Sequence, residues 1–162
     1  MLFMETPVKA KMIQAHMQVA EVYAQLSSAR RLKVGAIIVK DDRIISIGYN
    51  GMPAGWDNNC EDEVSETEIC FIDQGGPGMP ITTISLVTKP EVLHAETNAI
   101  AKLARSTESG DGATLFVTHA PCLDCAKLVY QSGINSVFYR NSYRSEDGIK
   151  FLQKANLHVN KI

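Results

Sequence analysis

Hydrophobic residues recur with two different periods along the chain, and these periods predict its helices and strands. A helical period opens the sequence, with apolar residues at Met12, Ala15, Val19, Val22, Tyr23 and Leu26. Thr6 followed by Pro7 has the character of an N-cap and a first helical residue. We therefore expect an amphipathic helix from residue 7 to about residue 28.

A strand period follows this helix. Residues 34–39 and 44–47 are rich in β-branched side chains, and Asp41-Asp42 between them has the character of a turn. This pattern predicts a hairpin of two buried strands. Residues 48–55 contain three glycines and one proline, which favour a loop after the second strand.

The second half of the chain alternates between the two periods. We expect helices at 92–106, from Pro121 to a stop at Gly133 with Leu128 and Val129 inward, and at 145–155. Strands are expected at 114–118 and 137–139, with an edge strand at 157–159. This order indicates an α/β fold, a three-layer α/β/α sandwich with a five-stranded mixed sheet.

Residues 56–90 interrupt the alternation. An acidic run is followed by Gly75-Gly76-Pro77-Gly78 and then by an apolar stretch at 81–87. A structureless loop of this length is uncommon in a compact domain unless it is functional. We interpret the segment as an insertion with its own local structure inside a single domain spanning residues 1–162.

Composition and charge narrow the class of protein. The 162 residues are 45% hydrophobic and 21% charged, which is ordinary for one globular domain. No apolar run approaches a membrane span, and residues 1–5 lack the character of a secretory leader, so a cytoplasmic protein without membrane contact is expected.

The net charge of −2 conceals an uneven distribution, because residues 56–88 hold seven acids and no Lys or Arg. The positive excess elsewhere is too small for a nucleic-acid groove but sufficient for a small phosphate ligand. Surface charge without consequence explains it equally well.

Two short stretches carry the candidate chemistry, His94-Ala95-Glu96 and Pro121-Cys122-Leu123-Asp124-Cys125. One imidazole and two thiols leave the fourth position of a zinc ion open, which is the catalytic rather than the structural arrangement. The two cysteines share a helix face, and a helix start favours their thiolates. Glu96, two residues after His94, is not expected to be a ligand and is placed to move protons.

Other interpretations of the same residues are open. A lone C-x-x-C motif also fits a redox pair or half of a structural zinc site, and H-x-E alone has little specificity. Cys60 and Cys70 lie inside the 56–90 segment and could bind a second zinc or stay free thiols. The acids of that segment could hold a magnesium ion or simply solvate it.

The combined pattern H-x-E and P-C-x-x-C is typical of zinc-dependent nucleobase deaminases. The similarity extends to further stretches, and together these resemble the deoxycytidylate (dCMP) deaminases, including those encoded by phages. The stretches are Lys33-Val34-Gly35-Ala36, Gly48-Tyr49-Asn50-Gly51-Met52-Pro53, His94-Ala95-Glu96-Thr97-Asn98-Ala99-Ile100 and Pro121-Cys122-Leu123-Asp124-Cys125-Ala126-Lys127. They cover most of the chain apart from residues 56–90.

The resemblance implies a cytidine deaminase-like fold and hydrolysis of dCMP to dUMP with release of ammonia, which supplies dUMP for dTTP synthesis. It assigns Zn2+ to His94, Cys122 and Cys125, and proton transfer to Glu96. It also implies that Asn50 binds the sugar and that the backbone of Ala95 contacts the base amine. Arg30, Arg31 and Tyr143 lie near the regions that contact the phosphate in the family.

The resemblance further implies a hexamer that is activated by dCTP and inhibited by dTTP, with Mg2+ bound beside the effector. The corresponding residues here are Asn50, Gly51 and Arg105, although a cation at a helix end also complements the helix dipole without any further role. Alternative functions are a deaminase of dCTP, of free deoxycytidine or of adenosine in tRNA, or a non-catalytic zinc or dithiol binding protein.

Overall fold

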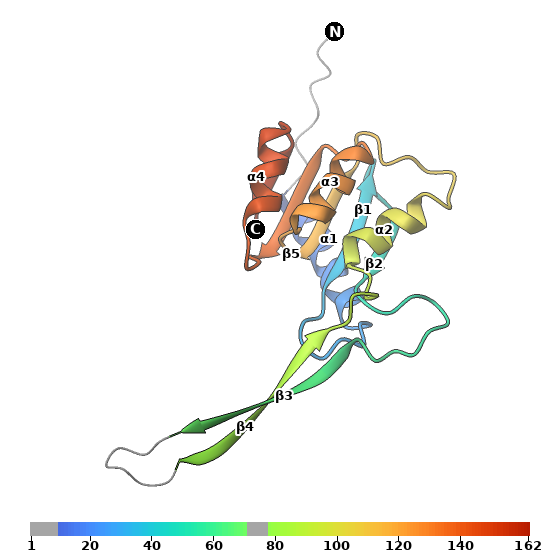
Figure 1. Ribbon diagram of the computed structural model, residues 1–162. Coiled ribbons are helices and arrows are strands. Elements are labelled where there is room, and N and C mark those ends of the chain that lie inside the picture. Colours follow the sequence, from blue (N-terminus) through green and yellow to red (C-terminus); the bar gives the residue numbers. More distant parts are fainter. Residues whose placement is uncertain (1–9, 71–77) are drawn as a thin grey trace.

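A mixed five-stranded sheet with the strand order β2-β1-β5-β6-β7 forms the middle layer of the fold. The computed structural model describes residues 10–70 and 78–162 (Figure 1). The strands of this sheet are β1 (Gly35–Lys40), β2 (Arg43–Tyr49), β5 (Thr114–His119), β6 (Ser136–Asn141) and β7 (His158–Lys161). β1 pairs antiparallel with β2 and β5, whereas β5, β6 and β7 run parallel.

Helices cover both faces of the sheet, so the predicted three-layer α/β/α sandwich is confirmed (Figure 1). On one face lies α1 (Ala10–Ala24), where Met17 and Ala20 pack on Phe116 and Phe138. On the other face lie α2 (Ala95–Leu103), α3 (Leu123–Gln131) and α4 (Asp147–Lys154). Alternate residues of β1, β5 and β6 therefore point into two separate cores.

The first helix differs from its prediction in extent and in its buried face. It ends at Ala24 rather than near residue 28, and the proposed start at Thr6-Pro7 lies outside the described residues. Val22 and Leu26 are exposed, because small side chains face the sheet instead. The helix approaches β1 so closely that a Cβ on Gly35 would lie 2.0 Å from the carbonyl oxygen of Ala20.

The later helices and strands lie where the hydrophobic periods predict them, but the helices are shorter than expected. Gly133 has a φ of 82° and follows the end of α3, as expected for a helix stop. The inward orientation of Leu128 was a wrong prediction, since its side chain is 45% exposed. Ala126 and Val129 take the inward face of α3, and Leu128 lies about 200° around the helix from Ala126.

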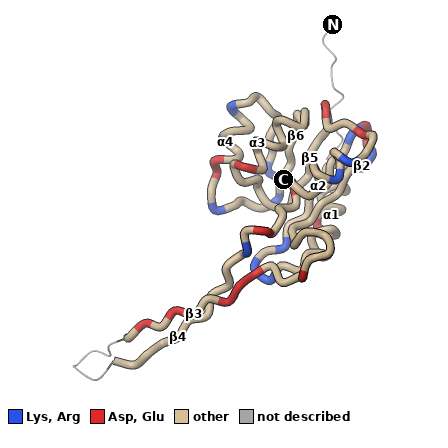
Figure 2. The backbone as a smooth tube through the Cα atoms, turned by 45° about the vertical axis from the view of Figure 1, so that its right-hand side comes forward, with Lys and Arg blue, Asp and Glu red and all other residues tan. Residues whose placement is uncertain are grey.

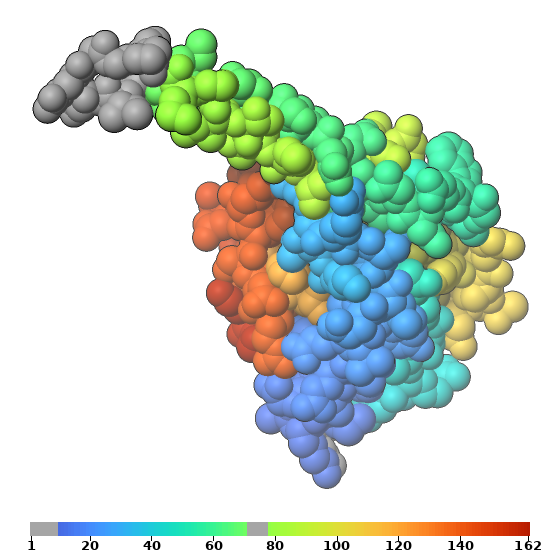
Figure 3. Space-filling model, turned by 90° about the horizontal axis from the view of Figure 1, so that it is seen from below, coloured from blue at the N-terminus to red at the C-terminus, as the bar shows by residue number. Residues whose placement is uncertain are grey.

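The segment 56–90 forms a separate antiparallel hairpin of β3 (Glu61–Cys70) and β4 (Met79–Thr88). Figures 1 and 3 show this hairpin projecting from the body of the protein. Glu61 pairs with Thr88 at its base, and Cys70 pairs with Met79 at its far end. The apolar stretch at 81–87 is thus a strand, but Ile81, Ile84 and Val87 are exposed in it. Figure 2 shows acidic residues along β3 and no charge on β4.

In the part of the chain that the structure describes, no helix has the length and apolar character required to cross a membrane.

Candidate metal centre and adjoining pocket

The starts of α2 and α3 bring the two candidate stretches together. His94 is the N-cap residue of α2 and Cys122 is the N-cap residue of α3, both with extended backbone (φ −73°, ψ 155° and φ −68°, ψ 169°). Neither side chain caps its own helix. Both are therefore available for contacts between the helices.

Two glycines allow these helix starts to lie close to their supports. A Cβ on Gly48 of β2 would lie 2.1 Å from the carbonyl oxygen of Ala95. A Cβ on Gly148 of α4 would lie 2.1 Å from the carbonyl oxygen of Pro121 and 2.8 Å from the carbonyl carbon of Cys122. Any larger residue at either position would displace a helix start, so both glycines help to fix the geometry of the site.

Three side chains form a cluster with the dimensions of a metal site. The Nδ1 atom of His94 lies 3.6 Å from the Sγ atom of Cys122 and 3.3 Å from the Sγ atom of Cys125. All three candidate ligand atoms lie within 4.8 Å of one another. In a tetrahedral zinc site with ordinary bond lengths, such atoms are separated by about 3.5–3.8 Å. The residues present therefore fit zinc, and three ligands leave one position open.

Hydrogen bonds among the three side chains of this cluster shift their pKa values in different directions. Hydrogen bonds with Cys125 and His94 lower the pKa of the Cys122 thiol to about 4. The same thiolate raises the pKa of Cys125, and burial raises it further. The hydrogen bond between His94 and Cys122 also raises the pKa of the His94 imidazole. Without a cation the cluster thus holds one stable thiolate, and a bound cation would favour the second.

Glu96 lies beside this cluster as the second residue of α2. Its side chain is only 4% exposed, and burial raises the pKa of its carboxyl group to about 7. The charge of His94 and a hydrogen bond with Cys125 act in the opposite direction. A carboxyl group with this pKa can both accept and release a proton near neutral pH.

A pocket of about 440 Å³ opens over the cluster and Glu96. Its lining includes four residues that the family resemblance assigns to the substrate, Arg31, Asn50, Ala95 and Tyr143, together with Arg144. The volume suits a small ligand, and the two arginines suit an anionic one.

Residues 10–141 match the family described as the cytidine and deoxycytidylate deaminase zinc-binding region. The chain belongs to this family. The deoxycytidylate deaminase of Enterobacteria phage T4 is 37% identical over 147 residues, which cover 78% of this chain and 76% of that protein. The deoxycytidylate deaminase of Mycobacterium phage D29 is 39% identical over 122 residues, covering 75% and 88%. The crystal structure of cyanophage S-TIM5 dCMP deaminase with dCMP and dUMP is 42% identical, with a TM-score of 0.77, and covers 96% of this chain and 99% of that chain.

Asn50 faces the pocket of this deaminase-family chain, but its amide also holds the neighbouring loop. Its Oδ1 atom accepts a hydrogen bond from the backbone N–H of Val34 at 2.8 Å. Its Nδ2 atom donates to the carbonyl of Leu32 at 2.8 Å. The side chain is therefore fixed in orientation, and its contact with a sugar stays a prediction.

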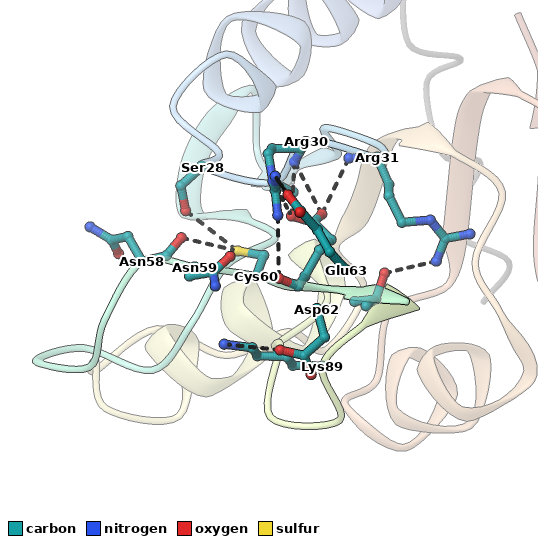
Figure 4. Close-up of polar contacts among 12 residues, drawn as sticks. Ser28, Arg30, Arg31, Asn58, Asn59, Cys60, Asp62, Glu63 and Lys89 are labelled. Carbon is teal, nitrogen blue, oxygen red and sulfur yellow. Dashed lines mark hydrogen bonds and ion pairs between the residues drawn. The ribbon is translucent and has the colours of Figure 1, made fainter. Parts of the chain in front are cut away.

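The two candidate arginines after α1 lie in different environments. Arg30 does not appear in the pocket lining, because its guanidinium group turns to Glu63, with an N–O distance of 2.9 Å (Figure 4). A contact between Arg30 and the phosphate therefore stays a prediction, and this ion pair competes with it. Arg31 lines the pocket and donates a hydrogen bond to the hydroxyl of Thr88 at 3.0 Å.

Two pocket residues, His119 and Arg144, were missed by the sequence analysis. His119 ends β5 just before the P-C-x-x-C motif, and burial lowers its pKa. Arg144 stacks on the ring of Tyr143 at 5.3 Å and donates to its hydroxyl at 3.1 Å. Their positions next to predicted site residues were the available signal.

The three residues expected at a regulatory site are not adjacent in one chain. Gly51 lies beside the start of α2, where it exchanges two backbone hydrogen bonds with Leu93. Arg105 follows the other end of that helix, roughly 15 Å further along it. Asn50 and Arg105 therefore lie near opposite ends of α2.

The ion pairs of Asp62 and Glu63 and the separation of Cys60 from Cys70 argue against a metal shared in the hairpin. Glu63 pairs with Arg30, and Asp62 pairs with Lys89 at 3.6 Å (Figure 4). Cys60 precedes β3 and Cys70 ends it, so they lie roughly 33 Å apart. The two cysteines cannot bind one zinc ion together, and both are free thiols.

Proposed function

We propose that this chain is a zinc-dependent dCMP deaminase, which hydrolyses dCMP to dUMP and ammonia and so supplies dUMP for dTTP synthesis. The observation that carries the proposal is the buried carboxyl of Glu96 beside the His94–Cys122–Cys125 cluster, in a pocket that also presents Arg31. The named activity of the phage relatives supports it, as does the dCMP and dUMP complex of the cyanophage enzyme.

His94, Cys122 and Cys125 would hold the zinc ion. Zinc in such a three-ligand site acts as a Lewis acid and lowers the pKa of a coordinated water to near 7. The start of α3 supports the thiolates, because unpaired backbone N–H groups there stabilise negative charge.

Glu96 would move both protons of the reaction. Its carboxylate accepts a proton from the attacking water and delivers it to N3 of the cytosine ring as oxygen adds to C4. It then transfers the second proton to the 4-amino group, which leaves as ammonia. The low exposure of Glu96 suits this role, because burial raises the pKa of the carboxyl toward neutral pH, where the group can both accept and release a proton.

The remaining pocket residues would orient the nucleotide. The backbone at Ala95 lies beside Glu96 and suits contact with the base amine, and Asn50 suits the sugar. Arg31 provides the cation for the 5′-phosphate, with Tyr143 and Arg144 beside it in the pocket lining. A monophosphate fits this set of cations.

A substrate panel tests the proposal against its alternatives. Purified protein is incubated with dCMP, dCTP, deoxycytidine and an RNA hairpin, and loss of cytosine absorbance and release of ammonia are followed. We expect the highest kcat/KM for dCMP. Preference for dCTP or deoxycytidine would change the substrate, and turnover of none would leave a zinc or dithiol binding protein.

Regulation is a second part of the proposal, supported by the resemblance of residues 48–53 to the family. In a hexamer, Asn50 and Gly51 of one subunit would meet Arg105 of another and bind dCTP as activator or dTTP as inhibitor, with Mg2+. Repeating the panel with each effector and Mg2+, together with sedimentation analysis of the assembly, tests this.

A further inference from the structure

Glu61 is a buried carboxylate that the proposed reaction does not use. It is the first residue of β3, at the base of the hairpin, and is only 1% exposed. Its Oε1 atom accepts hydrogen bonds from the backbone N–H groups of Arg30 at 3.0 Å and Arg31 at 3.2 Å, and its Oε2 atom lies 3.2 Å from the same N–H of Arg30. The carboxylate thus fixes the backbone at both arginines.

The register partner of Glu61 holds the other end of Arg31. Glu61 and Thr88 face each other across the first rung of the hairpin. The Nη1 atom of Arg31 donates to the Oγ1 atom of Thr88 at 3.0 Å. One rung therefore restrains this arginine at its backbone and at its guanidinium group.

Charge pairing leaves Arg31, unlike Arg30, available to a ligand. Arg30 is paired with Glu63 at 2.9 Å and lies 3.7 Å from Glu61, and Figure 4 shows its side chain turned to the hairpin. Among the ion pairs of the described residues none includes Arg31, whose side-chain partner is the neutral hydroxyl of Thr88. Arg31 and Thr88 both line the pocket.

We propose that Glu61 and Thr88 are positioning residues that orient Arg31 toward the 5′-phosphate, so that the base of the hairpin sets the preference for a nucleotide over a nucleoside. This inference rests on the proposed function. Neither residue touches the reacting atoms, so their loss should weaken phosphate recognition and spare the chemical step. A purely structural role would weaken nucleotide and nucleoside equally.

The test compares ligands that differ only in the phosphate. Glu61→Gln keeps the shape of the side chain but removes its charge and one acceptor. Weakening of one or two hydrogen bonds predicts a rise of about three- to thirtyfold in the KM for dCMP and in the Kd for dUMP measured by calorimetry. The kcat for dCMP, the kcat/KM for deoxycytidine and the Kd for deoxyuridine should stay within about twofold of wild type.

Two further variants complete the design. Thr88→Val removes only the hydroxyl that holds the guanidinium group of Arg31. It should raise the KM for dCMP and the Kd for dUMP by about three- to tenfold. Glu63→Gln is the matched control at the same hairpin base, because it releases Arg30 and leaves the contacts of Arg31 in place. It should change neither constant by more than about twofold.

The outcomes separate this inference from the proposed function. Absence of dCMP turnover by the wild-type protein would contradict the proposed function, and dUMP binding no tighter than deoxyuridine binding would contradict the role of Arg31. Equal losses for nucleotide and nucleoside would make Glu61 structural. If Glu61→Gln does not fold, Thr88→Val decides, and an unchanged KM for dCMP in that variant would overturn the inference.

Discussion

Replacement of Glu96 by glutamine should remove a pH-dependent loss of stability from the metal-free protein. The pKa of this carboxyl is raised from 4.5 to about 7 by burial, so between these values the folded protein keeps a proton that the unfolded chain loses. The free energy of unfolding therefore falls as pH rises through this window and is level above it. At 1.36 kcal/mol per pH unit, the difference amounts to about 3 kcal/mol.

Urea unfolding with a chelator present measures this effect between pH 4.5 and pH 8. Glutamine is neutral at every pH, so Glu96→Gln should match wild type at pH 4.5 and exceed it by about 3 kcal/mol at pH 8. Saturating zinc should reduce the difference, because a nearby cation favours the carboxylate. Parallel pH profiles for the two metal-free proteins would refute the buried, proton-retaining state of Glu96.

Four other substitutions probe the site and its supports. Glu96→Ala should keep stoichiometric zinc by metal analysis and lower turnover by about 100-fold or more. Cys122→Ser should lose zinc in the same measurement. A zinc-free Glu96→Ala protein would instead make Glu96 a ligand. Gly48→Ala should lower the free energy of unfolding by roughly 1–3 kcal/mol in urea, because its Cβ would meet the carbonyl of Ala95 at 2.1 Å; unchanged stability would contradict that packing. Arg105→Ala should weaken inhibition by dTTP and spare basal turnover, and an identical inhibition curve would exclude it from an effector site.

The sequence predicted the layers and the metal cluster because both depend on local patterns. The strand and helix periods are determined by which residues face a core, and the spacing of Cys122 and Cys125 by the pitch of one helix. Placement of His94 beside them required only a helix and a strand between two motifs. These features need no knowledge of contacts between distant side chains.

Local sequence patterns could not distinguish the environment of Arg30 from that of Arg31. Both follow the first helix, and only Glu61 and Glu63, some thirty residues later, distinguish their roles. That distinction depends on a hairpin whose strands are exposed on both faces, so neither shows the alternation that reveals register. The exposure of Leu128 was missed because neighbouring apolar residues do not show which one faces the core.

The base and the outer part of the projecting hairpin differ in how strongly the rest of the protein holds them. Beyond its first rungs, the described strands pair only with each other, and a lone two-stranded ribbon is marginally stable. Amide hydrogens of its outer rungs should therefore exchange with solvent far faster than those at Glu61. We therefore expect that the hairpin can be shortened, or extended to carry a label, without a change at the candidate metal centre, provided that the pair Glu61–Thr88 beside the pocket is kept.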